Sequence, residues 1–153
     1  MNHLLGDNLL LLFDGLCEPR NPGGFACYGW LIKSGDAVVA SGHGLAARNS
    51  TNNFAEYAAL GFGLRWLTDR QWSGKLKIMG DSKLVVEQIT QRWNCNKEHL
   101  QKLRARCWEL LAIVGEWEIT WHPREQNEEA DALSRQAYVE ETGQQPPERT
   151  RRK

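Results

Sequence analysis

The sequence has no long apolar run, no net charge and no internal repeat. Its 153 residues are 41% hydrophobic and 25% charged, which is ordinary for a folded protein and argues against global disorder. No stretch approaches the roughly 20 apolar residues that cross a membrane. The run at residues 9–13 is too short for the apolar core of a signal peptide. We therefore expect one cytoplasmic domain with no membrane partner.

Closely spaced cysteines are also missing. The four cysteines show neither a C-x-x-C spacing nor a zinc-finger pattern, and they are Cys17, Cys27, Cys95 and Cys107. We expect reduced thiols, although the spacing leaves open a bridge between Cys17 and Cys27 across an early hairpin. The sequence also offers no serine or cysteine motif of the kind that supplies a covalent nucleophile.

Charge is balanced overall, with 19 basic and 19 acidic residues, so the whole chain is no obvious binder of polyanions. Its distribution is uneven. Residues 92–106 carry five basic side chains against one acid, and residues 149–153 carry four more basic side chains. Taken alone, these stretches are typical of a solvated helix face and a polar tail.

Hydrophobic periodicity predicts an α/β fold with one mixed sheet flanked by helices. Five strands are expected, at residues 9–13, 25–33, 37–44, 75–80 and 116–121. Four helices are expected, beginning near Asn53, Asp81, Lys97 and Pro123. The order predicts three antiparallel strands followed by parallel strands that are reached through crossover helices. We place one domain at residues 1–140 and a disordered basic tail at residues 141–153.

Local motifs set two of the expected boundaries. Residues 16–24 contain two prolines and two glycines, which predicts a loop directly after the first strand. Asn53 is the expected N-cap of the first helix, because a capping residue there is followed three places later by Glu56.

Four acidic residues fall where such a fold would bring them together. Asp14 and Asp81 each end a strand in the middle of the sheet, and the carboxyl ends of parallel strands share one edge. Glu56 lies in the first turn of the first helix, and Asp131 lies in the last helix. Each has an alternative: a turn residue for Asp14, a capping partner for Glu56, an N-cap for Asp81 and a solvated position for Asp131.

Taken together, the four acids predict a metal site. No lysine or arginine is adjacent in sequence to any of them. Clustered carboxylates repel one another, so such a group costs stability unless a cation fills it. Carboxylate oxygens suit Mg²⁺ or Mn²⁺. Two such ions about 3.5–4 Å apart would serve an in-line displacement at phosphorus.

Four motifs, in order along the chain, resemble those of type 1 ribonuclease H. They are Phe13-Asp14-Gly15 with Asn21-Pro22-Gly23, Thr51-Asn52-Asn53-Phe54-Ala55-Glu56, Asp81-Ser82, and Asn127-Glu128-Glu129-Ala130-Asp131. The resemblance covers roughly residues 9–139. It implies a ribonuclease H-like fold. It also implies an Asp-Glu-Asp-Asp site that holds two Mg²⁺ or Mn²⁺ ions, at Asp14, Glu56, Asp81 and Asp131.

The resemblance further implies a substrate and a reaction. The substrate is an RNA–DNA hybrid, whose RNA strand is hydrolysed endonucleolytically by two metal ions to leave 5′-phosphate and 3′-hydroxyl ends. The enzyme is expected to be a monomer. Asn21, Asn52 and Asn53 match residues that contact the hybrid's minor groove, where short polar side chains can reach the 2′-hydroxyl. In isolation, each is equally a turn or cap residue. Thr51 and Asn96 match residues that hold a DNA-strand phosphate.

The chain departs from many relatives between the second and third helices. It lacks their basic protrusion there, so hybrid affinity is expected to be lower unless Lys102, Arg104 and Arg106 substitute for it. Trp93 is one position out of register with the aromatic residue of a DNA-strand channel. We interpret it as a core or rim tryptophan.

The loop before Asp131 is also shorter than in several relatives. His122 is the nearest equivalent of a flexible histidine thought to help product leave, but the following Pro123 stiffens the chain there. Arg124 resembles the arginine of relatives that carry Pro-Arg-Glu, and it is a candidate for contacting the scissile phosphate. A surface arginine is the alternative.

Two rival functions stay open. The first is another nuclease of the same fold, such as an exonuclease, a resolvase or an integrase. Proofreading exonucleases usually carry Asp-x-Glu in the first strand, and here the triplet is Asp14-Gly15-Leu16. The second rival is a non-catalytic hybrid-binding module, which would be expected to lack a carboxylate, whereas all four are present.

Overall fold

One mixed β-sheet forms the centre of the molecule, in the strand order β3-β2-β1-β4-β5. The structure is a computed structural model that describes residues 5–148. The strands of the sheet are β1 (Asn8–Glu18), β2 (Gly24–Ser34), β3 (Ala37–Ser50), β4 (Gly74–Gly80) and β5 (Gly115–Trp121). β1, β2 and β3 pair antiparallel, whereas β4 pairs parallel with both β1 and β5. The predicted five-stranded mixed sheet is confirmed.

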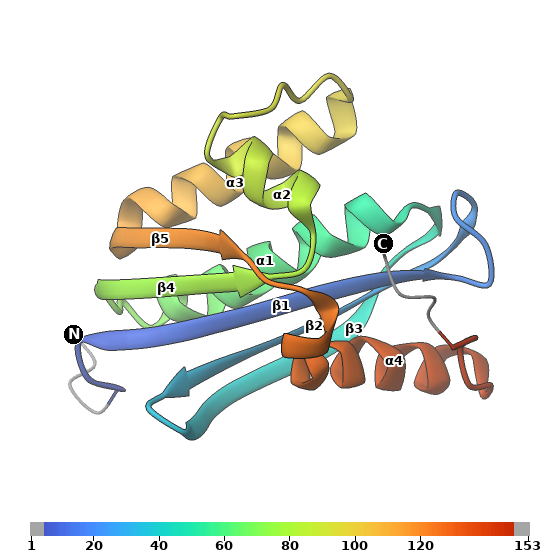
Figure 1. Cartoon of the computed structure of the whole chain (residues 1–153), viewed down its shortest axis with the longest axis horizontal. Helices are drawn as coiled ribbons and strands as arrows, with labels where there is room; N and C mark the ends of the chain where they lie inside the picture. The colour runs from blue at the N-terminus through green and yellow to red at the C-terminus, as the bar shows by residue number, and fades with distance from the viewer. Residues whose placement is uncertain (1–4, 149–153) are drawn as a thin grey trace.

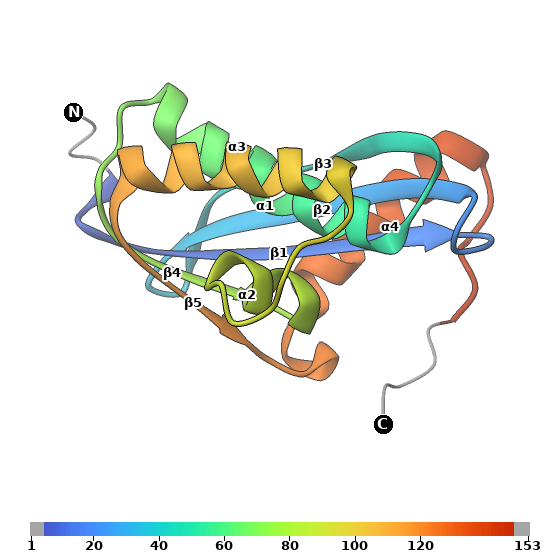
Figure 2. The same cartoon turned by 90° about the horizontal axis from the view of Figure 1, so that it is seen from above.

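Helices cover both faces of this sheet (Figure 1). They are α1 (Asn52–Asp69), α2 (Lys83–Ile89), α3 (Glu98–Val114) and α4 (Glu128–Thr142). A short 3₁₀ turn at Arg124–Gln126 precedes α4. α1 and α3 lie alongside one another on one face, as Figure 2 shows from above, and α4 lies on the other face. Within residues 5–148, no helix is long and apolar enough to cross a membrane.

The central strand β1 is buried on both faces because its side chains alternate between two apolar layers. Leu11 and Phe13 belong to the large core under α1 and α3. Leu12 packs instead with Ala130 of α4, and Leu16 packs with Tyr138 of α4. A strand covered by helices on both faces reads as a continuous apolar run, which is how residues 9–13 revealed it in the sequence.

β1 is longer than predicted, and this changes the position of Asp14. The expected loop at residues 16–24 is largely strand, because the antiparallel pairing with β2 continues to Glu18 opposite Phe25. Asp14 therefore lies inside β1, opposite Gly29, and not at its end. What does end there is the parallel pairing with β4, whose last partners are Phe13 and Gly80.

Three other predicted boundaries also shift. Thr51, and not Asn53, is the N-cap of α1, where its hydroxyl accepts a hydrogen bond from the Phe54 amide at 3.1 Å. Ser82, and not Asp81, is the N-cap of α2, so capping does not explain Asp81. β3 continues to Ser50, beyond the predicted end at residue 44. Pairing with β2 sustains this extension, which no local motif revealed.

The chain from residue 141 onward was expected to be a disordered tail, but the last helix continues into it. α4 continues to Thr142 and ends at Gly143, whose φ of 73° is the left-handed conformation of a helix C-cap. The Arg135 guanidinium then donates hydrogen bonds to the carbonyls of Pro146 and Pro147, and Pro146 is buried. The basic residues 149–153 lie outside the described residues.

All four cysteines are free and buried, so the bridge left open between Cys17 and Cys27 is absent. Burial raises the pKa of the Cys27 and Cys107 thiols to about 12. Burial likewise raises the pKa of Cys17. A thiol with such a pKa is almost wholly protonated at neutral pH, so it is a poor nucleophile.

We expect a thiol titration to reflect this burial. A disulfide reagent at pH 8 should label the native protein slowly, because Cys27 and Cys107 carry almost no thiolate until pH approaches about 12. In concentrated guanidinium the same reagent should count all four cysteines rapidly. Finding only two thiols in the unfolded, unreduced protein would show a disulfide and contradict the structure.

Candidate metal centre

Three of the four predicted carboxylates meet at the end of the parallel pairing. Asp14, Glu56 and Asp81 each present a carboxylate oxygen, and these oxygens all lie within 4.8 Å of one another. All three residues are buried, with 0%, 1% and 3% of their surface exposed, respectively. Buried like charges at this separation repel strongly, since little water screens them. The arrangement therefore favours a cation among the three side chains.

Strand register explains why two of these acids are neighbours. Phe13 and Gly80 are the last paired residues of β1 and β4, so Asp14 and Asp81 each follow directly after a member of that pair. Adjacent strands lie about 4.8 Å apart. The backbones of Asp14 and Asp81 are therefore close enough for their side chains to meet.

Glu56 reaches the same place because α1 approaches β1 unusually closely. A Cβ atom added to Gly15 would lie 2.4 Å from the Ala55 carbonyl carbon and 2.5 Å from the Glu56 nitrogen. No other residue type fits this contact without a backbone shift. Gly15 therefore lets the first turn of α1 lie against the strand beside Asp14.

A second glycine does the same for α4 on the other face. Gly29 is opposite Asp14 in the sheet, and a Cβ atom there would lie 2.6 Å from the Ser134 nitrogen and 2.7 Å from the Ala130 carbonyl. Gly29 was not singled out from the sequence, although glycine inside a strand often marks a close approach of another backbone. The contact brings the α4 segment that carries Asp131 onto the sheet near Asp14.

Asp131 lies in the first turn of α4 and is partly exposed. It is not one of the three residues whose oxygens lie within 4.8 Å of one another. Its helix is nevertheless tied to β1, because the buried Asn127 side chain at the N-cap donates a hydrogen bond to the Phe13 carbonyl at 2.9 Å. Asn127 belonged to a recognised motif, but its role as this link was not predicted.

The surroundings of Asp81 suit a cation. Within residues 5–148, neither of its carboxylate oxygens accepts a hydrogen bond. The Arg124 Nε lies 3.9 Å from Asp81 Oδ2, which is too long for a hydrogen bond but close enough for electrostatic attraction. No cation adjoins Asp81 along the chain, so it is the fold that brings Arg124 there. A buried carboxylate without hydrogen bonds is costly unless a positive charge compensates it.

Trp121, which the sequence did not single out, holds the backbone of Asp81. Its indole N–H donates to the Asp81 carbonyl at 3.1 Å, while 46% of the residue stays exposed. The next amide, of His122, donates to the Gly80 carbonyl at 2.9 Å. These two hydrogen bonds extend the contact between β4 and β5 beyond their paired residues. They fix the backbone position of Asp81.

The His122 ring is held on both sides. Its Nδ1 lies 2.9 Å from Gln126 Oε1, and its Nε2 lies 3.1 Å from Thr120 Oγ1. With its own backbone amide bonded to β4 as well, the residue is anchored at three points. This disfavours the mobile role that a histidine in a long loop can have.

The three predicted groove-contacting asparagines lie at or against the start of α1, the helix that carries Glu56. Asn21 Oδ1 accepts a hydrogen bond from the Asn52 backbone amide at 3.0 Å, so the loop after β1 is joined to the start of α1. Asn53 is the next residue of the same helical turn. Asn21 is exposed and the other two are partly exposed, so their side chains can meet a ligand from solvent.

Thr51 and Asn96 flank two helix starts that are close together. The rings of Phe54 in α1 and His99 in α3 stack, with centroids 6.4 Å apart. Asn96 is exposed and lies two residues before α3. The first turns of two helices concentrate backbone N–H groups, which favours an anion between them. Trp93, in the same loop, is 45% exposed, which excludes a place in the core.

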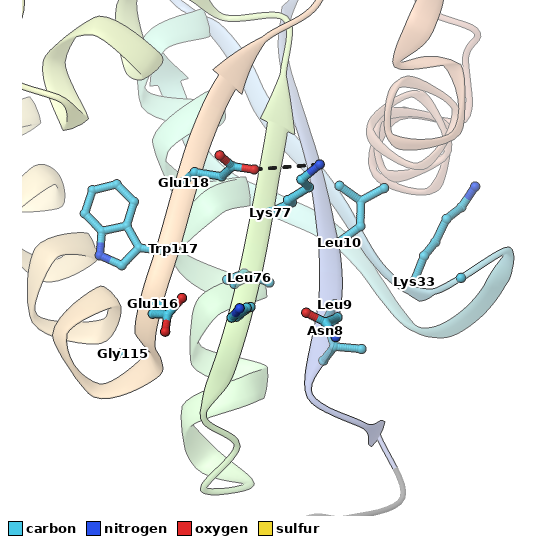
Figure 3. Close-up of a pocket in the computed structure, with 12 residues that line it drawn as sticks. Asn8, Leu9, Leu10, Lys33, Leu76, Lys77, Gly115, Glu116, Trp117 and Glu118 are labelled. Atoms are coloured by element: carbon cyan, nitrogen blue, oxygen red, sulfur yellow. Dashed lines mark ion pairs between the residues drawn. The ribbon is translucent and has the colours of Figure 1, made fainter.

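A large hollow lies elsewhere on the sheet. It has a volume of about 790 Å³ and is lined by the first residues of β1, β4 and β5. Figure 3 shows Lys77 and Glu118 pointing toward one another there, 3.7 Å apart. Lys75 at this end is six residues before Asp81, which along a strand is about 20 Å. The hollow is thus separate from the carboxylates. Its distance from them does not count against a duplex ligand, which needs an open surface more than a pocket.

Comparison with known proteins shows the family of this chain. Residues 12–137 match a family described as "Reverse transcriptase-like". The chain is 39% identical over 132 residues to "Ribonuclease HI" of Halobacterium salinarum, covering 86% of this chain and 65% of that protein. It is 34% identical over 118 residues to "Bifunctional protein Rv2228c" of Mycobacterium tuberculosis, covering 76% of this chain and 32% of that protein. The chain therefore spans less than two thirds of the length of these relatives.

Solved structures resemble the chain over almost its whole fold. The crystal structure of RNase H1 from Halobacterium salinarum aligns with a TM-score of 0.79 and 39% identity, covering 87% of this chain and 98% of that one. The N-terminal RNase H domain of Rv2228c aligns with a TM-score of 0.81 and 29% identity, covering 91% of this chain and all of that one, at 100%.

The Gly15 contact generates one prediction. Gly15→Ala should lower the free energy of unfolding by about 1–3 kcal/mol, because α1 must move away from β1 to admit the methyl group. The same shift carries Glu56 away from Asp14, so divalent cations should stabilise the variant less than the wild type. Chemical unfolding with and without Mn²⁺ measures both effects.

Gly61→Ala is the matched control, because a Cβ there would meet only Cys107 Sγ, at 3.8 Å. It should be neutral or stabilising by up to about 1 kcal/mol, as alanine is in a helix. Equal losses in the two variants would contradict the close-contact explanation for Gly15.

The carboxylate cluster generates a second prediction. Saturating Mn²⁺ should raise the thermal midpoint of the wild type by about 5–10 °C, since a ligand at 100 times its Kd contributes about 2.7 kcal/mol. Asp81→Asn should lose most of that rise. Without metal it should be at least as stable as the wild type, because one repelling charge is gone. The same Mn²⁺-dependent rise in both proteins would show that the ion binds elsewhere.

Proposed function

Since the chain belongs to the reverse transcriptase-like family and has a ribonuclease H-like fold, we propose that it hydrolyses the RNA strand of RNA–DNA hybrids. The observation that carries the proposal is the group of three buried carboxylates at the end of the β1–β4 pairing, with their oxygens within 4.8 Å of one another. Fold alone does not determine activity, so the site is the stronger support. The relatives named ribonuclease H share both the family and the fold.

Asp14, Glu56 and Asp81 hold divalent cations in this proposal, with Asp131 of α4 as a fourth ligand. Their oxygens are the donors that Mg²⁺ and Mn²⁺ prefer. Two such ions would supply Lewis acidity for activating a water and for neutralising charge on a departing 3′-oxygen, and the expected products carry 5′-phosphate and 3′-hydroxyl ends. No covalent intermediate is required, which agrees with the four buried and free cysteines.

The chain's own residues would orient the RNA strand. Asn21 uses its Oδ1 to accept from the Asn52 amide, which leaves its side-chain NH₂ to donate to a sugar or base in the minor groove. Asn52 and Asn53 present further amides from the first turn of α1. The 2′-hydroxyl that such groups sense distinguishes the RNA strand from the DNA strand.

The DNA strand would be held by Thr51 and Asn96. The Thr51 oxygen accepts from the Phe54 amide as the N-cap, and its hydroxyl proton remains able to donate to a phosphate oxygen. On α3, the guanidinium of Arg104 stacks over Trp108 at 4.3 Å, whereas Lys102 and Arg106 are exposed. These exposed basic residues would add general attraction to the duplex in the absence of a protrusion.

Arg124 has a further role in this proposal. Its side chain is 23% exposed, and its Nε lies 3.9 Å from Asp81 Oδ2. A guanidinium there can donate two hydrogen bonds to a phosphate as the strand arrives. The anchored His122 is the weaker candidate for assisting turnover, because its three hydrogen-bonded contacts limit its movement.

Cleavage of defined substrates tests the proposal. With Mg²⁺ or Mn²⁺ the chain should cut the RNA strand of a labelled hybrid, and should leave duplex DNA, duplex RNA and single-stranded RNA intact. Asp81→Asn should lower kcat by about a thousandfold or more, since the metals contribute several kcal/mol to the transition state. Its folding should be unchanged by circular dichroism.

Glu116→Gln is the matched control, because Glu116 is an exposed acid on β5 that lines the hollow at the other end of the sheet. It should cleave at the wild-type rate. Cutting of DNA would contradict the proposed substrate and would favour another nuclease of this fold. Tight hybrid binding without any cutting would favour a binding module instead.

A further inference from the structure

The loop at residues 90–97, between α2 and α3, consists mostly of exposed residues and has a polar network beneath it. Trp93 and Asn96 are among its exposed residues. The amides of Arg92 and Trp93 both donate to the Glu87 carbonyl, at 2.8 and 3.1 Å, which closes the end of α2. These bonds fix the first half of the loop. The second half, which carries Asn96, depends on side chains from elsewhere.

A chain of two hydrogen bonds, the first buried and the second partly buried, connects α1 to that second half. The Tyr57 hydroxyl donates to Gln88 Oε1 at 2.7 Å, and Gln88 Nε2 donates to the Asn94 carbonyl at 3.1 Å. Tyr57 is 0% exposed and Gln88 is 5% exposed, so water has little access to the bond between these two side chains. Burial raises the pKa of Tyr57, so its hydroxyl keeps the proton that it donates.

A second glutamine side chain donates a hydrogen bond to the next backbone carbonyl along the loop. Gln101 Nε2 of α3 donates to the Cys95 carbonyl at 2.7 Å, and the Cys95 side chain is buried in the core. The two peptide carbonyls directly before Asn96 are thus held by one glutamine from α2 and one from α3. The first of these bonds leads on to α1 through Tyr57.

We propose that Tyr57 and Gln88 are a positioning pair that fixes Asn96 relative to Thr51, so that the two side chains hold one phosphate of the DNA strand together. The proposal rests on the function proposed above. Tyr57 is six residues after Thr51 on the same chain segment, within α1, so the hydrogen-bonded chain joins the loop to the helix that carries Thr51. Neither Tyr57 nor Gln88 touches the substrate.

Preorganisation is the physical reason for this arrangement. A phosphate held between two side chains binds more tightly when their separation is set beforehand, because less conformational entropy is lost on binding. A buried hydrogen bond adds little net stability to a protein, since the same groups bond to water when unfolded. It does fix direction and distance, which apolar packing does less well. The stacked rings of Phe54 and His99 form a separate contact between the two helix starts.

A double-mutant cycle tests the pair. Asn96→Ala should raise both the KM and the Kd for a hybrid about tenfold in the wild-type background, as expected for a lost hydrogen bond to a charged group. In the Tyr57→Phe background the same change should cost less than about threefold, because Asn96 is already misplaced. Tyr57→Phe alone should raise KM about three- to tenfold and leave kcat within about twofold.

A purely structural role for Tyr57 predicts a different result. Tyr57→Phe would then lower the thermal midpoint while KM and Kd stayed unchanged. Alternatively, Tyr57→Phe and Asn96→Ala would raise Kd independently, so that the double variant showed the product of the two fold-changes. Either outcome overturns the proposal. Gln88→Met removes the bond to Asn94 at nearly constant length, and it should reproduce the coupling to Asn96→Ala.

Tyr138→Phe is the matched control, because Tyr138 is a buried tyrosine on α4 that packs edge-on against Phe25. It should change neither KM nor Kd. The binding arm also separates the two proposals. A chain that binds hybrid without cutting it would refute the catalytic function but still allow the coupling to be measured. A chain that neither binds nor cuts hybrid would refute both.

Discussion

The repulsion between buried carboxylates is the constraint on which the arrangement of this protein depends. Parallel pairing of β1 with β4 ends at Phe13 and Gly80, and this register places Asp14 and Asp81 next to one another. Glu56 joins them, with the three carboxylates presenting oxygens within 4.8 Å. Such a group lowers stability unless a cation compensates it. The surrounding contacts therefore hold together three carboxylates that electrostatic repulsion alone would separate.

The contacts that hold the three carboxylates together are mainly backbone contacts and single hydrogen bonds. Gly15 and Gly29 let helices approach the sheet from opposite faces at the position of Asp14. Asn127 and Trp121 bond to the carbonyls of Phe13 and Asp81. Each contact fixes the backbone beside an acid and leaves its carboxylate to face the others. A site built in this way is set by the fold before any ligand arrives, which is the preorganisation that catalysis on a phosphate requires.

Strong local patterns predicted much of this. The apolar run at residues 9–13 indicated a strand buried on both faces, and helical periodicity located α1 and α3. The predictions failed where long-range pairing overrides local composition. The proline- and glycine-rich residues 16–24 read as a loop, yet pairing with β2 keeps β1 extended to Glu18. The contacts of Arg124 and Gln88 were equally hidden, because a cation or an amide brought in by folding leaves no mark on the neighbouring sequence.

Anomalous X-ray scattering from crystals soaked in Mn²⁺ tests the central claim most directly. The account predicts Mn²⁺ bound by carboxylate oxygens of Asp14, Glu56 and Asp81, at roughly 2.0–2.2 Å, the range for small divalent ions. Contradiction would come from a saturated crystal with no anomalous peak among these three side chains. A peak found instead beside Glu116 and Glu118, at the opposite end of the strands, would equally show that the metal-binding account is wrong.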